Sequence, residues 1–152
     1  MKKKILITGS EGQLGTALQI VLSNNFTIFP TARKPSELSI KKNNIIDMDI
    51  TNIDNVSNII NLFNPHIIIN CAAYSNVDGN EANKKLSHQV NVEGITNLIQ
   101  ASNKETFIIH ISSDYVFDGR NGPYNENDHT FPVNYYGKTK LESENILRGS
   151  RR

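Results

Sequence analysis

The stretch ILITGSEGQLG, residues 5–15, constrains the fold more than any other part of the chain. A short aliphatic, β-branched run ends in a cluster of glycines, and from Leu14 onward apolar side chains recur at the spacing of an amphipathic helix. This order predicts a buried parallel strand over residues 5–7, a tight turn, and a helix over residues 12–22 that packs on the sheet.

The glycines of the turn, Gly9, Gly12 and Gly15, have the spacing GxxGxxG. This spacing is wider at its first step than the GxGxxG of common dinucleotide-binding dehydrogenases, and no Gly-Lys-Ser/Thr follows, which excludes a P-loop. A helix that begins here presents free N–H groups and a partial positive charge, and the glycines let a pyrophosphate approach the backbone. We therefore predict a nucleotide-binding turn; a tight turn without a ligand is the alternative.

The rest of the chain alternates between strand and helix patterns. We expect further strands over residues 26–29, 44–50, 67–71 and 107–112, and helices over residues 53–63, 81–101 and 135–147. Pro30 and Pro65 should end a strand and a helix, and the long helix should be interrupted near Gly94. The alternation predicts a Rossmann-like α/β fold, in which a doubly wound parallel sheet of about five strands is flanked by helices.

Composition limits the partners of the chain. Its 152 residues correspond to about one domain, which we place at residues 1–148, and its 16 basic and 15 acidic residues form no basic patch for nucleic acid. The single cysteine, Cys71, excludes an internal disulfide and fits a reducing compartment such as the cytoplasm. No apolar stretch approaches a membrane span, and the histidines lack metal-ligand spacing, so we expect neither a membrane nor a metal.

The end of the second expected strand bears on the choice of nucleotide. About 20 residues beyond the glycine turn, a dinucleotide fold often places a carboxylate on the adenosine ribose. Here the stretch PTARK carries no carboxylate, and Arg33 could instead pair with a 2′-phosphate. This favours NADP(H) as the cofactor, with NAD(H) as the alternative if Arg33 is only a solvated surface residue.

The stretch NYYGKTKLESE, residues 134–144, carries the candidate acid–base pair. A helix places Tyr136 and Lys140 on one face, because they are four residues apart, whereas Tyr135 has Lys138 at the i+3 position. A nearby ammonium favours the ionised form of a tyrosine, whose ordinary pKa is about 10, and so makes it a better acid–base group near neutral pH. Two unconnected surface residues are the alternative.

Small and polar residues at two strand ends provide a setting for this pair. Ser112 and Ser113 close the strand over residues 107–112, at the edge where open α/β sheets bind ligands, and a hydroxyl there could hydrogen-bond a carbonyl oxygen. The stretch NCAAY, residues 70–74, ends the preceding strand with small side chains that would let a cofactor pass.

Taken together, these motifs resemble the extended short-chain dehydrogenase/reductase family. They are GxxGxxG at residues 9–15, NCAA at 70–73, VNVEGITNL at 90–98 and the Tyr136-xxx-Lys140 pair. Within the family, AAYSNVD, SSDYVFDG and NYYGKTKLESE are most similar to the enzymes that reduce the 4-keto group of a dTDP-6-deoxy sugar. The resemblance runs from about residue 4 to residue 146 and implies a dTDP-sugar substrate.

The resemblance also implies a role for each candidate. Tyr136 would donate a proton to the C4 oxygen during hydride transfer from the nicotinamide, and Lys140 would bind the nicotinamide ribose and lower the tyrosine pKa. Ser113 matches the Ser/Thr that orients the carbonyl, and Tyr115 would contact substrate. With the residues argued above, the expected cofactor contacts are Gly9, Gly12, Gln13, Leu14, Gly15, Arg33, Asp49, Ile50, Ala72, Ala73, Tyr74, Asn91, Tyr136 and Lys140.

One local difference favours reduction over dehydration. Related 4,6-dehydratases carry Asp-Glu after the catalytic Thr/Ser, because the elimination of water needs further acid and base groups. Here Asp114 is followed by Tyr115. A nucleotide-sugar epimerase uses the same catalytic residues, and some relatives are non-catalytic regulatory subunits, so both functions stay open as alternatives.

The family's reductases are nearly twice as long as this chain. The resemblance therefore implies the cofactor-binding half, which would stop before the last strands and the substrate domain and would have impaired turnover. The strand over residues 107–112 would form a sheet edge unless another chain covers it, as a homodimer would. Residues 149–152 lack apolar periodicity and are expected to be a frayed or artificial tail.

Overall fold

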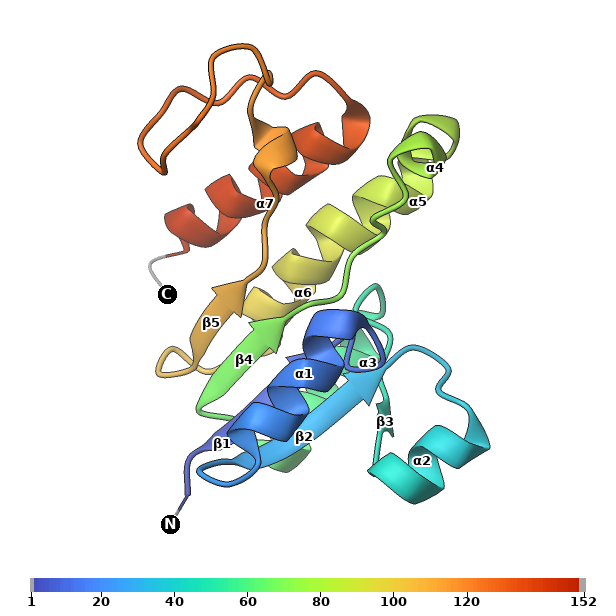
Figure 1. The fold of residues 1–152 in the computed structure, drawn as a ribbon. Coiled ribbons are helices and arrows are strands. Elements are labelled where there is room, and N and C mark those ends of the chain that lie inside the picture. Colours follow the sequence, from blue (N-terminus) through green and yellow to red (C-terminus); the bar gives the residue numbers. More distant parts are fainter. Residues whose placement is uncertain (1, 151–152) are drawn as a thin grey trace.

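Five parallel strands form one sheet in the computed structural model, which describes residues 2–150. The strands are β1 (Lys4–Thr8), β2 (Thr27–Ala32), β3 (Ile46–Asp47), β4 (Ile67–Asn70) and β5 (Phe107–His110). Their order across the sheet is β3-β2-β1-β4-β5. The direction of winding changes between β1 and β4, which is the position where doubly wound sheets bind their ligands (Figure 1).

Helices cover both faces of the sheet (Figure 1). The α-helices are α1 (Gln13–Leu22), α2 (Glu37–Asn43), α3 (Ile53–Phe63), α4 (Val77–Ala82), α5 (Lys84–His88), α6 (Gly94–Ala101) and α7 (Tyr135–Gly149). The π-helical segment η1 (Gln89–Glu93) joins α5 to α6, and the 3-10 turn η2 (Asp114–Val116) follows β5. The Rossmann-like, doubly wound fold predicted from the sequence is confirmed.

Alternation along the strands divides the apolar side chains between two clusters. Leu6, Ile68 and Ile108 face α3 and α6 and belong to the larger buried cluster. Ile5 and Ile7, on the other pleat of β1, join a second cluster that includes partly buried residues of α1. Strands of this sheet are apolar on both pleats because both faces are covered.

Two expected strands have different bounds in the structure. β2 continues through Pro30, because β3 pairs only with Thr31 and Ala32 and leaves one side of the strand unpaired at the proline. The expected strand over residues 44–50 is wrong in length, since only the two residues of β3 pair there. α2, which precedes it, is not predicted from the sequence; Ser36 caps this helix by accepting the N–H of Ser39 at 3.1 Å.

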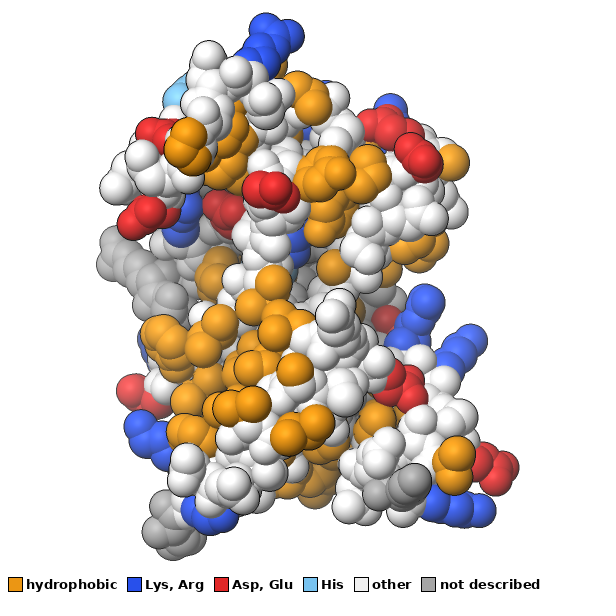
Figure 2. Space-filling view, viewed as in Figure 1, with side chains coloured by type: hydrophobic (Ala, Val, Ile, Leu, Met, Phe, Trp, Pro, Cys, Tyr) orange, Lys and Arg blue, Asp and Glu red, His pale blue; other side chains and the backbone are white. Residues whose placement is uncertain are grey.

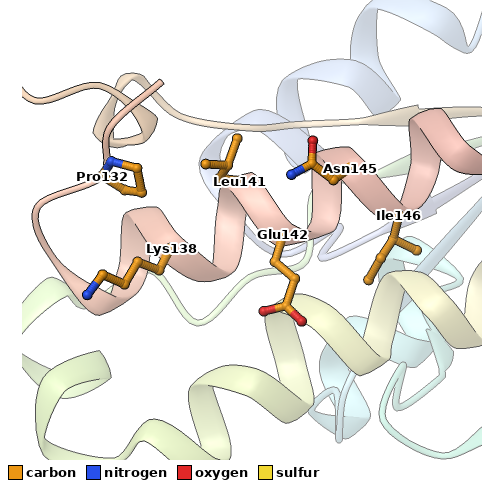
Figure 3. A pocket seen from close by; sticks show the side chains of 6 residues that line it. All are labelled: Pro132, Lys138, Leu141, Glu142, Asn145 and Ile146. Atoms are coloured by element: carbon orange, nitrogen blue, oxygen red, sulfur yellow. The ribbon is translucent and has the colours of Figure 1, made fainter. Parts of the chain in front are cut away.

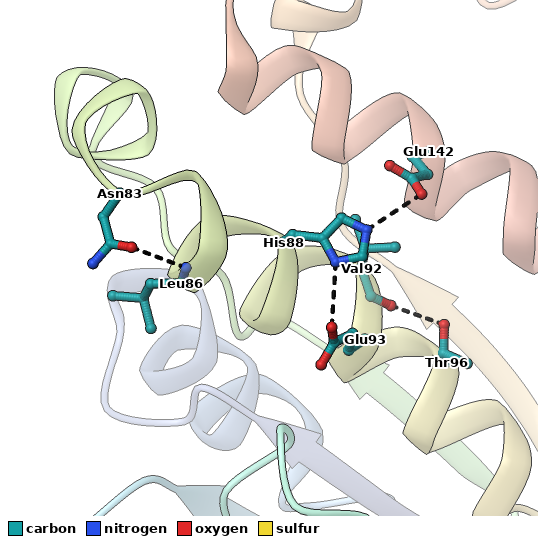
Figure 4. Close-up of polar contacts among 7 residues, drawn as sticks. All are labelled: Asn83, Leu86, His88, Val92, Glu93, Thr96 and Glu142. Atoms are coloured by element: carbon teal, nitrogen blue, oxygen red, sulfur yellow. Dashed lines mark hydrogen bonds and ion pairs between the residues drawn. The ribbon is translucent and has the colours of Figure 1, made fainter.

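The helical segment expected over residues 81–101 begins earlier and is divided. It starts with α4, and Asn83 separates α4 from α5 with a non-helical backbone, while its side chain caps α5 by accepting the N–H of Leu86 (Figure 4). The interruption expected near Gly94 is confirmed, because η1 directly precedes this glycine. A Cβ at Gly94 would lie 2.5 Å from the Cδ1 of Ile50, so the glycine permits the close packing seen there.

His88, the last residue of α5, lies between carboxylates of η1 and α7 (Figure 4). Its Nδ1 is 3.4 Å from Glu93 Oε1, and its Nε2 is 3.5 Å from Glu142 Oε1. Because these side chains are partly exposed, each ion pair contributes less than about 1 kcal/mol when the ring is protonated. The contacts nevertheless show that η1 lies directly beside α7.

β5 pairs with β4 alone among the residues that the structure describes, so the expected sheet edge is confirmed. The strand ends at His110 rather than at residue 112. Phe107, Ile109 and Ile111 face the side of α1 and are 57%, 39% and 37% exposed. Figure 2 shows hydrophobic side chains gathered over β4, β5 and α1 on this face.

α7 continues two residues beyond the end expected at residue 147, so the tail expected over residues 149–152 begins inside this helix. Residues 151 and 152 lie outside the described part of the chain. Between residues 2 and 150, no helix has the length and apolar character needed to cross a membrane.

Candidate active site

A cleft of about 540 Å³ lies at the carboxyl ends of β1, β2, β4 and β5. It occupies the position where the winding of the sheet changes direction. The expected cofactor contacts that line it are Gly9, Gly12, Leu14, Arg33, Asp49, Ile50, Ala72, Ala73, Tyr74, Tyr136 and Lys140. Gly9 and Lys140, which are 131 positions apart in the chain, therefore meet in a single cleft, as a dinucleotide site requires.

The glycine turn forms one wall of this cleft through two positions where a side chain would not fit. Gly9 has a φ of +61°, and a Cβ there would lie 2.8 Å from the backbone N of Ala72 at the end of β4. Gly15 is buried, and its Cβ would lie 2.5 Å from the carbonyl oxygen of Gly9. The first glycine thus brings the turn against β4, and the last packs α1 onto the turn.

The N-terminus of α1 lies open to the cleft. Its N-cap, Gly12, provides no side-chain cap, whereas the N-cap side chains Ser36, Asn52, Asn76, Asn83, Ser113 and Asn134 each accept a backbone N–H at the start of another helix. The first N–H groups of α1 are therefore available to an anion, which fits the pyrophosphate of a dinucleotide. Gln13, the first residue of α1, is exposed and does not line the cleft.

The opposite end of the cleft is formed by the segments after β2 and β3. Arg33 directly follows β2, is exposed and lines the cleft, as the sequence predicts. Asp49 also lines it, but its Oδ1 accepts the N–H and the hydroxyl of Thr51 at 2.9 and 2.8 Å. Asp49 therefore shapes the turn that precedes α3.

Tyr136 and Lys140 both line the cleft from α7. Asn134 positions the start of this helix by accepting the N–H of Gly137 at 2.7 Å. Lys140 is 1% exposed, and its Nζ donates to the carbonyl oxygen of Ile111 at 2.6 Å. Burial lowers the pKa of Lys140 to about 8, although the carboxylate of Glu144 acts in the opposite direction.

The expected lowering of the Tyr136 pKa by Lys140 is not what the structure shows. Burial raises the pKa of Tyr136 above its usual value, and a hydrogen bond with Ser113 opposes this rise only in part. The physical reason is that burial is the largest influence on the phenol, while the ammonium of Lys140 bonds to Ile111 and adjoins His110. Ser113, as predicted, adjoins Tyr136.

Ser113 and Tyr115 belong to a neighbouring region rather than to the main cleft. Ser113 lines a second cavity of about 650 Å³ beside β5 and α7, and its Oγ accepts the N–H of Tyr115 at 3.2 Å. The ring of Tyr115 is 5.7 Å from that of Tyr136, in an edge-to-face arrangement. The phenol of Tyr136 therefore lies between the main cleft and the region that carries the two predicted substrate contacts.

The other two members of the YYGKTK stretch point elsewhere. The backbone N–H of Tyr135 bonds to Glu81 at 2.6 Å, and its ring lies under the Nζ of Lys84. Lys138 is exposed on α7 and lines a separate pocket with Pro132 and Glu142 (Figure 3). The choice of Tyr136 and Lys140 from helical spacing therefore agrees with the geometry.

Asn91, predicted as a cofactor contact, does not line the cleft. It is buried in η1, where its Oδ1 accepts the N–H of Tyr74 at 2.8 Å and its Nδ2 donates to Thr139 of α7 at 3.0 Å. Asn91 thus fixes the cleft residue Tyr74 and the helix of Tyr136 relative to each other. Its contribution to the site is indirect.

Two groups beside the site, Glu144 and His110, are not identified from the sequence, whereas Ser112 is expected at this edge of the sheet. Ser112 lines the main cleft and donates a short hydrogen bond to Glu144, while His110 lies beside Lys140. Only tertiary packing brings these residues together, although the i+4 spacing of Glu144 from Lys140 could have indicated that pair. Within residues 2–150, no group of three or more His, Cys, Asp or Glu side chains is placed to hold a metal ion.

Fold and cleft together define a class of protein. A doubly wound sheet with a glycine turn after β1, and a Tyr-xxx-Lys helix beside β5, is the dinucleotide-binding architecture of the short-chain dehydrogenases and reductases. More specifically, the chain belongs to the family described as RmlD substrate binding domain, whose model matches residues 2–152.

Relatives agree with this assignment. dTDP-4-dehydrorhamnose reductase of Aggregatibacter actinomycetemcomitans is 42% identical over 146 residues, which make up 95% of this chain and 46% of that protein. Methionine adenosyltransferase 2 subunit beta of Danio rerio is 38% identical over 148 residues, 96% of this chain and 44% of that protein.

A solved structure gives the same result. The crystal structure of dTDP-4-dehydrorhamnose reductase from Bacillus anthracis in complex with NADP matches with a TM-score of 0.84 and 34% identity, over 100% of this chain and 51% of that chain. The chain thus spans about half the length of the relatives it matches. The family resemblance predicted from the sequence is confirmed, and the family is one of sugar-nucleotide reductases and related oxidoreductases.

Proposed function

We propose that this chain binds NADP(H) and serves the reduction of the 4-keto group of a dTDP-6-deoxy sugar, converting dTDP-4-dehydrorhamnose to dTDP-L-rhamnose. The observation that carries the proposal is the meeting of the glycine turn, Tyr136 and Lys140 in one cleft. The 42% identical dTDP-4-dehydrorhamnose reductase supports the choice of substrate.

The proposed cofactor binds along the cleft, with its pyrophosphate on the uncapped N-terminus of α1. The side chain of Arg33 at the opposite end would pair with the 2′-phosphate, which favours NADP(H) over NAD(H). The related reductase that was crystallised with NADP supports this choice. When bound, the reduced cofactor supplies the hydride that C4 of the sugar accepts.

The protein's own part in the reaction is to place and supply a proton. Tyr136 would donate its hydroxyl proton to the C4 oxygen, so that the carbonyl becomes an alcohol. Ser113, which hydrogen-bonds Tyr136, would orient that oxygen. Lys140 would hold the ribose of the cofactor through its ammonium hydrogens, and Tyr115, whose ring packs edge-to-face on Tyr136, would contact the sugar.

Replacement of Tyr136 by phenylalanine tests this assignment. We expect the affinity for NADPH, measured by fluorescence titration, to stay within about twofold, because phenylalanine keeps the ring that lines the cleft and removes only the hydroxyl. Oxidation of NADPH by dTDP-4-dehydrorhamnose should fall by about 100-fold or more. A Tyr136→Phe variant that turns over at the rate of the original chain would overturn the role of Tyr136.

A second candidate is a non-catalytic, cofactor-binding subunit of another enzyme. It is favoured by the 38% identity to methionine adenosyltransferase 2 subunit beta, whose name denotes a subunit. NADPH binding without turnover in either the original chain or the Tyr136→Phe variant would support this candidate. The absence of NADPH binding would contradict both functions.

A further inference from the structure

A chain of hydrogen-bonded side chains runs beneath the cleft from β1 to α7. Thr8 Oγ1 donates to Asn70 Oδ1 at 2.5 Å, and Asn70 Nδ2 lies 3.0 Å from Nδ1 of His110. The other ring nitrogen of His110, Nε2, lies 2.9 Å from Ser143 Oγ and 3.1 Å from Lys140 Nζ. Thr8 and Asn70 are 1% and 2% exposed, so their polar groups depend on one another.

The direction of this chain follows from the placement of the Asn70 amide. Thr8 Oγ1 accepts the N–H of Ala72 at 3.1 Å and donates its own hydrogen to the amide oxygen of Asn70. The NH₂ group of Asn70 then faces His110, whose Nδ1 must act as an acceptor. With Thr8 donating to Oδ1 of Asn70 and Nδ2 of Asn70 facing His110, a turn of this amide would exchange donor and acceptor at both of its neighbours.

The ring of His110 is neutral near pH 7. Burial, and then the positive charge of Lys140, lower its pKa to about 3. A neutral imidazole carries one hydrogen, and with Nδ1 accepting from Asn70 that hydrogen is on Nε2. Ser143 can accept it, because its own hydroxyl donates to the carbonyl oxygen of Lys140 at 2.7 Å.

We propose that His110 is a positioning residue for Lys140: held as the Nε2–H tautomer by Ala72, Thr8 and Asn70, it presents a hydrogen instead of a lone pair to the lysine nitrogen. An ammonium carries three hydrogens. Within residues 2–150, Lys140 Nζ places one on the carbonyl oxygen of Ile111. Because His110 accepts none, the others are directed into the cleft, where the proposed function, on which this inference rests, needs them for the ribose.

Other titratable groups surround Lys140. From α7, Glu144 favours its charged form, and Tyr136 lines the same cleft; from the end of β4, Cys71 also lines the cleft. The carboxylate of Glu144 accepts a hydrogen bond from Ser112, and its Oε2 lies 3.1 Å from Arg148 Nη2. Its negative charge therefore interacts with these groups as well as with Lys140. Among the groups named here, His110 is the one whose effect on Lys140 depends on the direction of the hydrogen-bond chain, because that direction decides which ring nitrogen carries the hydrogen.

The tautomer can be measured directly on the original chain. Long-range ¹H–¹⁵N NMR distinguishes a ring nitrogen that carries hydrogen from one that does not, and a His110→Gln variant assigns the signals. We expect a hydrogen on Nε2 and a lone pair on Nδ1 at pH 7. The opposite pattern in the original chain would overturn the proposal.

A matched pair of substitutions at Thr8 tests whether the hydrogen-bond chain sets the tautomer of His110. Thr8→Ser retains the hydroxyl and should retain the tautomer. Thr8→Val removes the donor, so Asn70 can turn, the hydrogen of His110 can move to Nδ1, and Nε2 can accept from Lys140. The pKa of Lys140, followed through its ¹³Cε shift and assigned with Lys140→Met, should then rise by roughly one unit. An unchanged His110 tautomer and an unchanged Lys140 pKa in a folded Thr8→Val variant would contradict the proposal that the hydrogen-bond chain sets the tautomer.

Addition of NADP⁺ separates this inference from the proposed function. If both hold, the cofactor shifts the ¹³Cε signal of Lys140 in the original chain, and shifts it less in Thr8→Val. If the tautomer is as expected but NADP⁺ leaves Lys140 unchanged, the positioning of the lysine hydrogens stands as a property of the fold and the proposed ribose contact is wrong.

Discussion

At the scale of the residue, position 9 requires both a positive φ and the absence of a Cβ, and only glycine meets the two requirements. Its φ is +61°, and the space where a Cβ would be is taken by the backbone of Ala72. We expect Gly9→Ala to lower the free energy of unfolding by about 2–4 kcal/mol, because a backbone penalty of about 1 kcal/mol is added to a steric one. Urea unfolding measures the change, and NADPH titration should show weaker binding.

Gly119 provides the matched control. Its φ is +74°, but a Cβ there would have nothing within 4 Å. Gly119→Ala should therefore cost only the backbone penalty of about 1 kcal/mol and leave NADPH binding unchanged. Equal losses at the two positions would show that the contact with β4 contributes nothing to stability.

His110 gives the chain a specific sensitivity to acid. Its pKa is about 3 in the folded protein, against an ordinary value near 6.5, so between these values the unfolded chain binds more protons. Stability that is complete above pH 6.5 should be lost as the pH falls toward 3, by about 2–5 kcal/mol, where the lower figure allows for the partial exposure of the ring.

Urea unfolding between pH 7 and pH 4 measures this dependence. His110→Gln cannot take up the proton and should show a shallower fall in the free energy of unfolding over this range. His129→Gln removes an exposed imidazole from the loop before α7 and serves as the control. Identical slopes in the His110→Gln variant and the original chain would contradict the assignment of the acid sensitivity to His110.

At the scale of the element, α7 approaches η2 more closely than a helix with a side chain at residue 137 could. A Cβ at Gly137 would lie 2.1 Å from the carbonyl oxygen of Tyr115. In an isolated helix, alanine is more favourable than glycine by about 1 kcal/mol. Here we expect Gly137→Ala to destabilise the protein by about 2 kcal/mol or more, because η2 must move away.

Gly149→Ala is the control for this substitution, because the same helix has open space at that position. It should be neutral or slightly stabilising. Near-ultraviolet circular dichroism should also change in Gly137→Ala, since Tyr115 and Tyr136 lose their edge-to-face contact. Equal thermal midpoints for the two variants would show that α7 and η2 are not held at this distance.

The long, strongly periodic elements are predictable from the sequence, and the short ones are not. The strand at Ile5 and the helix over residues 53–63 carry their pattern in their own residues. The two-residue strand β3 and the short helix α2 depend on pairing and capping that local patterns do not specify. The strand end expected at Pro30 is wrong for the same reason. β2 accepts a proline at this position because β3 pairs only with the two residues that follow it.

At the scale of the whole molecule, the cleft is more predictable than the groups that support it. Its lining comes from strand ends and a glycine turn, and parallel winding places all of these at one edge of the sheet. The bonds from Thr8 to Asn70 and from Asn70 to His110 join residues 62 and 40 positions apart, between strands whose register no local motif gives. The hydrogen bonds of Asn91 are unpredictable on the same grounds, since its partners Tyr74 and Thr139 are tertiary neighbours.

A lysine substitution should affect stability strongly on one face of β5 and weakly on the other. Ile108 is 4% exposed in the larger core cluster, while Ile109 is 39% exposed on the face beside α1. Ile108→Lys should unfold the chain, because it buries an unpaired ammonium. Ile109→Lys should change the free energy of unfolding by less than about 1 kcal/mol and reduce concentration-dependent light scattering, because it interrupts the exposed apolar row of an edge strand. Equal destabilisation by the two variants would mean that the face of Ile109 is covered in solution.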